Sequence, residues 1–323
     1  MTAKTSKSEP SRGRGANKPS HLPVRGWYDI LLRTYKEISA DNLSLVAAGV
    51  AFYALLAIFP TVAASISLYA FIAEPVEIQQ QFASLATVLP AEARPIVLQQ
   101  VHTLTSSSDK SLGITFIVGL LLAIFSAMKG MNAIITALNI VYDENEKRGF
   151  FRLNLDAFLL TVASIVLMIL LLSLLVVVPV VLRYANLSAL STSIVSLLRW
   201  PILLLLVAPV IAALYSFAPS RDRPKWRWVN WGAIIAAVLW LTASIGFSIY
   251  VENFASYNKV YGSVGALVIL LMWFFISAYV LLVGAELNAE MEHQTTVDTT
   301  EGPSEPMGER NAYVADTVGE RQG

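Results

Sequence analysis

Six long stretches without a charged side chain constrain this chain more than any other feature of its sequence. A bilayer span needs about 20 consecutive apolar residues, and inside the hydrocarbon every backbone N–H and C=O must be paired within the segment, so runs of this length must be helices. Transmembrane barrels show alternating segments of about 10 residues instead, which this sequence lacks. The pattern predicts an all-α, polytopic membrane protein built as a bundle of six transmembrane helices. The predicted spans cover residues 43–73, 112–132, 157–182, 200–219, 229–251 and 261–285, and the second of them extends past its charge-free run to include Lys129.

Composition excludes the soluble classes of protein. Only 14% of the residues are charged and 55% are hydrophobic, whereas an average soluble domain has about 25% charged residues. The 23 basic residues balance the 23 acidic ones, which argues against a nucleic-acid partner, because proteins that bind nucleic acids carry excess Lys and Arg for the phosphates. The absence of Cys excludes disulfides, thiolate metal sites and a cysteine nucleophile.

Lys and Arg are distributed unevenly over the connections between the predicted spans. The stretch before Asp41 holds eight, the fourth connection holds four, and the second holds four when Lys129, near the end of the second span, is counted with it. The first and third connections hold two each, and the fifth holds Lys259 alone. Since cytoplasmic loops carry the excess of basic residues, both termini are predicted to be cytoplasmic, with the first, third and fifth connections outside.

The two ends of the chain differ from the membrane domain, which is predicted at 27–290. Residues 1–26 are basic and rich in Ser, Gly and Pro, while residues 291–323 are acidic. Both ends are predicted to be disordered tails, because they offer little apolar surface to bury. The basic tail is either a binding segment for anionic lipid or only a topology signal.

Two segments outside the spans have helical patterns. At 27–38, an apolar face with Trp27 and Leu31 opposes a polar face with Asp29 and Arg33, which predicts a short helix in the cytoplasmic membrane interface. The first outer connection has apolar residues at helical spacing on both sides of a proline, which predicts two short amphipathic helices. These helices either cover a cavity as a lid or anchor the connection at the outer interface.

A polar stripe on the second span contains the clearest candidate functional residue. Lys129, Asn132, Thr136 and Asn139 are spaced three, four and three residues apart, so they share one helical face. An ionisable group inside a membrane costs roughly 2.5–3.5 kcal/mol and therefore indicates function. The stripe either lines a wet pathway for an anionic group or belongs to a cytoplasmic extension of the helix beyond the membrane.

Prolines inside the predicted spans free backbone carbonyls that a helix would otherwise pair. Unpaired backbone at membrane depth is tolerated where it is buried in protein or lines a cavity. Pro60 lies in the middle of a first span that is longer than a bilayer requires, and Pro179, Pro201 and Pro209 lie in the third and fourth spans. Pro60 is therefore the leading candidate for a functional kink.

Three stretches resemble a known family. Ala47–Pro60 reads AAGVAFYALLAIFP, Ala137–Tyr142 reads ALNIVY, and Tyr261–Glu290 reads YGSVGALVILLMWFFISAYVLLVGAELNAE. Together they resemble the YihY/BrkB family of bacterial inner-membrane proteins. The resemblance implies six helices and an inner-membrane location, and it implies little about activity. The positions that match the family motifs are Phe52, Tyr53, Pro60, Asn139, Tyr261, Gly262, Gly265, Glu286 and Asn288.

Glu286 stands out among these positions because it lies at the C-terminal end of the last span, where the helix dipole disfavours a lone carboxylate. A cationic partner would relieve that cost. Arg148 and Arg152 are possible partners, and Lys129 is the more informative one. We therefore hypothesise that a Glu286–Lys129 pair forms an inner gate, with Tyr53 and Pro60 beside the pathway.

Some members of the family were once labelled ribonuclease BN, and the sequence argues against that activity here. A metal-dependent nuclease needs clustered His and carboxylate ligands. The three histidines, His21, His102 and His293, lie in the two tails and an outer connection. We expect no catalytic residues, metal or cofactor.

The sequence favours a transporter or exporter of a small or lipidic solute, with the lipid bilayer as its main partner. Its alternative is a membrane scaffold that anchors envelope partners without transport, and an intramembrane enzyme ranks last. A homo-oligomer is compatible with the sequence, which gives no sign of its size.

Overall fold

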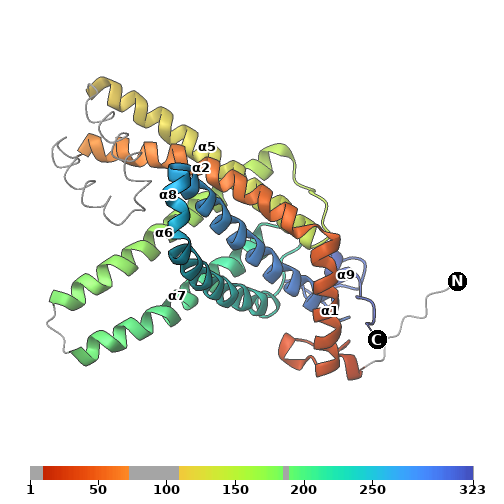
Figure 1. Ribbon diagram of the computed structural model, residues 1–323. Helices are drawn as coiled ribbons and strands as arrows, with labels where there is room; N and C mark the ends of the chain where they lie inside the picture. The colour runs from red at the N-terminus through yellow and green to blue at the C-terminus, as the bar shows by residue number, and fades with distance from the viewer. Residues whose placement is uncertain (1–9, 73–108, 185–188, 323) are drawn as a thin grey trace. The chain divides into compact units, whose positions relative to one another are not determined.

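The computed structural model is built from helices (Figure 1). It describes residues 10–72, 109–184 and 189–322, and within them the side chains of 11–61, 117–167, 204–252 and 267–322 together with Pro201 and Gly265. The helices are α1 (Val24–Ala40), α2 (Leu43–Ile72), α5 (Asp109–Val141), α6 (Phe150–Tyr184), α7 (Ala189–Phe217), α8 (Trp226–His293) and α9 (Tyr313–Asp316). Two 3-10 turns precede them, η1 (Pro10–Arg12) and η2 (Pro19–His21). Strand pairing within the described ranges is limited to one isolated bridge between Pro224 and Thr300.

The hydropathy of these helices identifies the chain as a polytopic membrane protein. Five helical segments are long and apolar enough to cross a bilayer, namely Leu43–Thr61, Ile117–Val141, Phe150–Leu167, Trp226–Glu252 and Leu267–His293. A further apolar segment, Leu204–Phe217, is shorter. The predicted all-α membrane fold is thereby confirmed. The amphipathic helices predicted for the first outer connection lie outside the described residues.

The predicted fifth and sixth spans both belong to α8, whose two ends lie side by side. A straight helix of its 68 residues would extend roughly 100 Å. Yet the backbone N–H of Gly232 donates a hydrogen bond to Oδ1 of Asn288, 56 residues later, at 2.8 Å, and Nδ2 of Asn288 donates to the carbonyl of Val229 at 2.9 Å. The chain must therefore reverse direction between these two parts of α8.

The described chain forms two compact units. The first comprises Met1–Ala47, Ile134–Leu241 and Tyr279–Gly323, and the second comprises Ala48–Ala133 and Thr242–Ala278. A buried apolar cluster joins the N-terminal segment, α1 and both ends of α8 within the first unit. Its members are Ala16, Leu22, Ile30, Trp228, Leu287 and Met291.

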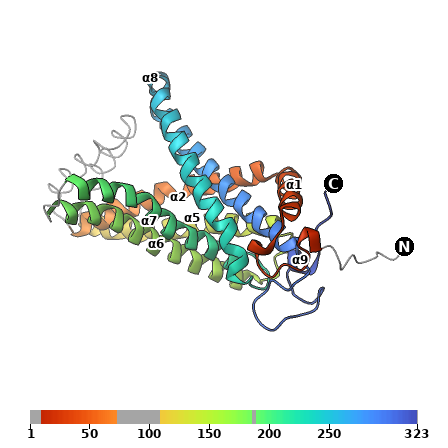
Figure 2. The same cartoon turned by 90° about the horizontal axis from the view of Figure 1, so that it is seen from below.

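The terminal segments differ from the disordered tails that the composition predicts. Residues 10–22 pack beside α1, and residues 294–322 contact the α7–α8 connection before the chain returns to α1 at its end (Figure 2). The Arg14 guanidinium donates to the carbonyl oxygens of Gln294 and Gly319, at 3.3 and 2.7 Å. These contacts join residues 280 and 305 positions apart, so no local pattern indicates them. Residues 1–9 lie outside the described part.

The helix predicted at 27–38 is α1, but its polar face is buried instead of solvated. Asp29 forms an ion pair with Arg12 at 2.6 Å, and Arg33 pairs with Glu290 at the end of α8. The sequence pattern was therefore wrong about the environment of Asp29 and Arg33, because their partners come from the terminal segments and α8. The opposite face exposes an apolar stripe at helical spacing, formed by Val24, Tyr28, Leu31 and Tyr35.

Candidate functional site

The polar stripe of the second predicted span lies on α5, and its members differ in exposure. Lys129 and Thr136 are exposed, Asn132 is half-buried and Asn139 is buried. The Lys129 ammonium lies 5.4 Å from the centroid of the Phe125 ring. Of the four, Asn139 is the residue that joins the polar network described below. The location of Lys129 inside the membrane, which the pathway interpretation requires, stays a prediction.

The motif residues of the first span lie on α2. Phe52 and Tyr53 are exposed, and their rings meet edge to face with centroids 5.6 Å apart. Pro60 is half-buried within α2. The hydroxyl of the next residue, Thr61, donates to the carbonyl of Ala57 one turn earlier, at 2.7 Å. Such a bond back to the backbone often accompanies a bend in a helix.

The motif residues of the last span fall into two groups along α8. Asn288 and Glu286 are buried, and Asn288 bridges the two ends of the helix through the bonds given above. Tyr261 and Gly262 lie in α8, but their side chains are outside the described set, and Gly265 is half-buried. Oε2 of Glu286 has no hydrogen-bond partner among the described residues. Its pairing with Lys129 stays a prediction.

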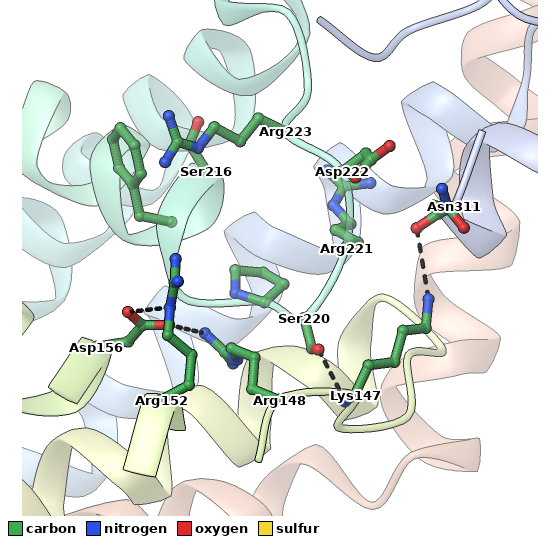
Figure 3. A pocket seen from close by; sticks show the side chains of 12 residues that line it. Lys147, Arg148, Arg152, Asp156, Ser216, Ser220, Arg221, Asp222, Arg223 and Asn311 are labelled. Atoms are coloured by element: carbon green, nitrogen blue, oxygen red, sulfur yellow. Dashed lines mark hydrogen bonds and ion pairs between the residues drawn. The ribbon is translucent and has the colours of Figure 1, made fainter. Parts of the chain in front are cut away.

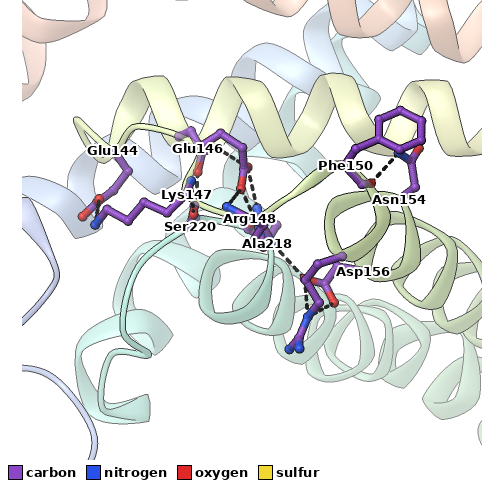
Figure 4. A network of polar contacts seen from close by, with 11 residues as sticks. Glu144, Glu146, Lys147, Arg148, Phe150, Asn154, Asp156, Ala218 and Ser220 are labelled. Atoms are coloured by element: carbon purple, nitrogen blue, oxygen red, sulfur yellow. Dashed lines mark hydrogen bonds and ion pairs between the residues drawn. The ribbon is translucent and has the colours of Figure 1, made fainter.

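Asn139 joins three parts of the first unit at the end of α5. Its Oδ1 accepts a hydrogen bond from the backbone N–H of Ser220 at 2.7 Å, and its Nδ2 donates to Oε2 of Glu146 at 2.9 Å. The Ser220 hydroxyl in turn accepts from the backbone N–H of Lys147 at 3.0 Å. These bonds connect α5 to the α5–α6 and α7–α8 connections, as Figure 4 shows for the two connections.

Arg148 is held by carboxylates and is therefore not the partner of Glu286. Its guanidinium donates to Glu146 at 2.8 Å, to Asp156 at 3.4 Å and to the carbonyl of Ala218 at 2.9 Å (Figure 4). Partial burial would raise the pKa of the Glu146 carboxyl, but hydrogen bonds from Arg148 and Asn139 outweigh it and lower the pKa to about 2. The pair thus stays ionised at physiological pH and fixes the two connections together.

A basic cavity of about 320 Å³ lies between these two connections (Figure 3). Asn311 of the C-terminal segment completes its wall. Two acidic side chains, Asp156 and Asp222, also line it. The cationic side chains that line it are Lys147, Arg148, Arg152, Arg221 and Arg223. Such a surplus of cations favours an anionic ligand.

Arg221 connects the cavity wall to the C-terminal segment. Its fully buried guanidinium pairs with the equally buried Glu292 at 2.7 Å and lies 4.1 Å from the centroid of the Tyr142 ring. Glu292 also accepts a hydrogen bond from the Thr299 hydroxyl at 2.8 Å. From the sequence, the basic residues of the fourth connection were interpreted only as a sign of membrane orientation. The acidic residues near the C-terminus were the one sequence signal that some of these basic residues form ion pairs.

Three carboxylates gather where α1 and α5 end. Asp41 is the C-cap residue of α1, Glu37 lies one turn earlier, and Asp143 follows α5 with a φ of 54°. Partial burial, reinforced by the charges of Asp143 and Glu37, raises the pKa of Asp41 to about 7. The negative ends of the α1 and α5 dipoles add to this cost of ionisation, and the positive end of α2, which begins at Leu43, offsets part of it for Asp41.

We expect Asp41→Asn to stabilise the protein at pH 8. Because the folded-state pKa of about 7 exceeds the ordinary value of 3.8, the stabilising effect of the protonated carboxyl is complete below about pH 4 and is lost as the pH rises through 7. The expected gain in unfolding free energy is on the order of 1 kcal/mol, since water screens a half-buried carboxyl. Thermal unfolding in detergent measures this gain.

The gain from Asp41→Asn should vanish toward pH 4, and Glu301→Gln, at an exposed acid, is the control. An equal gain at both pH values would contradict this account.

An apolar groove of about 600 Å³ lies between α7 and the first part of α8. Pro201 and Pro209, two of the prolines noted in the sequence, line its α7 side together with leucines and an alanine. Its α8 side follows one helical face from Trp226 to Val238, about 18 Å along the helix axis. Asn230 is the uncharged polar residue near the Trp226 end. The groove is therefore long and apolar, with polar side chains at one end.

Comparison with known proteins gives a family for the chain. The family model described as Virulence factor BrkB matches residues 34–308. YfkH of Bacillus subtilis (strain 168), whose name describes it as ribonuclease-like, is 32% identical over 247 residues, covering 75% of this chain and 88% of that protein.

A UPF0761 membrane protein of Vibrio vulnificus (strain YJ016) is 35% identical over 115 residues, which is 35% of this chain and 36% of that protein. No solved structure matches the chain. The family match covers most of the chain and includes the motif stretches on α2, α5 and α8. The chain belongs to the YihY/BrkB family of membrane proteins.

Proposed function

We propose that this protein transports a lipidic, amphiphilic solute, and that the groove between α7 and α8 is the place where the solute binds. The groove is the observation that carries the proposal. It runs along two apolar helices, and its exposed residues include Leu205, Ile234 and Val238. A groove of about 18 Å spans more than half of a hydrocarbon core of about 30 Å, so it is long enough for an acyl chain.

The polar end of the groove suits the head of such a solute. Trp226 and Asn230 lie at the start of α8, directly after a connection that is rich in Arg and Lys. Tryptophan is enriched at membrane–water interfaces, and asparagine supplies both a donor and an acceptor. The two prolines of α7 each remove a helical hydrogen bond at the groove wall, which would help this wall adapt to a ligand.

The proposal includes six crossings with α7 as the fourth, both termini in the cytoplasm, and a location in the bacterial inner membrane. The uneven distribution of Lys and Arg supports the orientation. Nuclease activity has no part in the proposal, although the name of the Bacillus relative mentions it. A scaffold without transport is the alternative that the experiment below must separate.

Blocking the groove should abolish transport. Purified protein in liposomes is tested with a panel of fluorescent phospholipids and single-chain amphiphiles, whose transfer between leaflets is followed by chemical quenching. We expect Val238→Trp, which fills the groove, to slow transfer by about tenfold or more. Leu239→Trp is the matched control, because Leu239 has similar exposure on the same helix and lies outside the groove lining.

Two results would contradict transport of this kind. If no member of the panel moves faster than in protein-free liposomes, the scaffold function is favoured. If Val238→Trp and Leu239→Trp slow transfer equally, the groove is not the binding place. The variant Lys129→Ala in the same assay tests whether the polar stripe of α5 belongs to the pathway.

A further inference from the structure

The basic cavity contains two buried donor groups without partners. The Ser216 hydroxyl and Nε of Arg221 both belong to residues that line the cavity, and neither has a hydrogen-bond partner among the described residues. The side chain of Arg221 is fully buried, and Ser216 is 4% exposed. Burying a donor without a partner is costly, and such groups are rare in folded proteins. Both donors are covered from solvent, so a ligand that accepts hydrogen bonds would pair with them where the cavity wall shifts to admit it.

Two further cations at the cavity are accessible to a ligand. The Arg152 side chain is 71% exposed and has only a weak pair with Asp156 at 3.2 Å. Arg223 is exposed and lies with its guanidinium 4.6 Å from the centroid of the Phe217 ring. Both guanidiniums keep donors available, in contrast to Arg148, which is occupied by Glu146, Asp156 and a backbone carbonyl.

Carboxylates behind the cavity wall pair with three of its five cations, which leaves Arg152 and Arg223 to face a ligand. The carboxylates that neutralise Lys147 and Arg221 are Glu144 and Glu292, which are buried and do not line the cavity. The first turn of α6 carries no acidic residue and contributes Arg152 to the lining. The positive end of the α6 dipole therefore adds to the potential of the cations.

We propose that this cavity binds a phosphate group, carried either by an anionic lipid headgroup or by a small soluble phosphate. Guanidinium forks and a hydroxyl are the donors that suit tetrahedral oxyanions. A volume of about 320 Å³ is at the lower end of the range for ligand pockets, which fits a headgroup-sized molecule. Binding here is independent of the proposed transport, because the groove and this cavity share no lining residue.

The test measures binding to the full chain in detergent or nanodiscs, without any transport assay. Calorimetry with inorganic phosphate examines the soluble source. Native mass spectrometry of protein from nanodiscs of phosphatidylcholine, with or without phosphatidic acid, examines the lipid source. We expect Arg152→Gln combined with Arg223→Gln to weaken binding by about tenfold or more, because each charge-assisted hydrogen bond contributes about that factor. Ser216→Ala tests the buried hydroxyl without removing any described contact.

The control is Arg227→Gln, which removes an exposed arginine next to the α7–α8 connection that does not line the cavity. Loss of phosphate binding in the double variant but not in the control supports a soluble ligand. The same pattern for phosphatidic acid alone supports a lipid headgroup. If neither molecule binds, or if the control weakens binding as much as the double variant, the proposal is overturned. Unchanged thermal unfolding of the variants excludes misfolding as the cause.

Discussion

Gly232→Ala is expected to lower the unfolding free energy by about 2–4 kcal/mol, because overpacking and the loss of buried hydrogen bonds act together. A Cβ atom on Gly232 would lie 2.3 Å from the carbonyl oxygen of Gly284 and 2.4 Å from Oδ1 of Asn288. The first of these neighbours is backbone, so it cannot rotate away. The two ends of α8 would have to separate, and the bonds from Asn288 to Gly232 and Val229 would break with them.

Gly246→Ala is the matched control on the same helix. A Cβ atom at Gly246 meets no atom of the described residues within 4 Å, and alanine is favoured over glycine inside a helix by up to about 1 kcal/mol. Thermal unfolding in detergent should therefore show a large loss for Gly232→Ala and no loss for Gly246→Ala. Equal stability of the two variants would mean that the ends of α8 do not approach each other as the structure has them.

This close approach gives a physical meaning to part of the family motif. The sequence marked Asn288 as a family-motif residue without giving it a role, and in the structure its side chain holds two backbone groups of the preceding helical segment. Gly284 contributes by its lack of a side chain, since a Cβ there would lie 2.5 Å from that of Ala236. Small residues that allow helices to approach closely are a common feature of membrane helix contacts.

The sequence was sufficient for the membrane fold because the signal is local. A gap in charge from Asn42 to Ala73 locates α2 (Leu43–Ile72) almost to the residue. The gaps locate the apolar part of the other helices but not their ends, since α6 begins at Phe150 while its charge-free run begins only at Ala157. Helical backbone continues through charged residues once the chain leaves the hydrocarbon, and hydropathy does not indicate where it stops.

The candidate site was less accessible to sequence reasoning because its contacts are long-range. Asn139 was named from a motif, but its partners Ser220 and Glu146 lie in different connections. Composition marked residues 291–323 as a solvated acidic tail, whereas Asp298 is buried and accepts hydrogen bonds from Thr300 and Glu305. Charge balance along a chain does not reveal which acid pairs with which base.

Removing one partner of the Arg221–Glu292 pair should destabilise the protein strongly. Both side chains are fully buried, and an uncompensated buried charge typically costs about 3–5 kcal/mol. We expect Arg221→Met to lower the unfolding temperature in detergent by many degrees. Because Thr299 binds the same carboxylate, the C-terminal segment should also become sensitive to limited proteolysis. Arg223→Met, at an exposed neighbour, should change neither measurement.

A double variant separates the loss of the pair from the loss of packing. Arg221→Met combined with Glu292→Met removes both charges, and replacing a buried pair by apolar residues of similar volume is often neutral for stability. The double variant should therefore recover most of the stability that Arg221→Met loses. If it is instead as unstable as the two single variants added together, the two side chains act independently. The Arg221 guanidinium would then stabilise the fold through its contact with the Tyr142 ring, and not by holding Glu292.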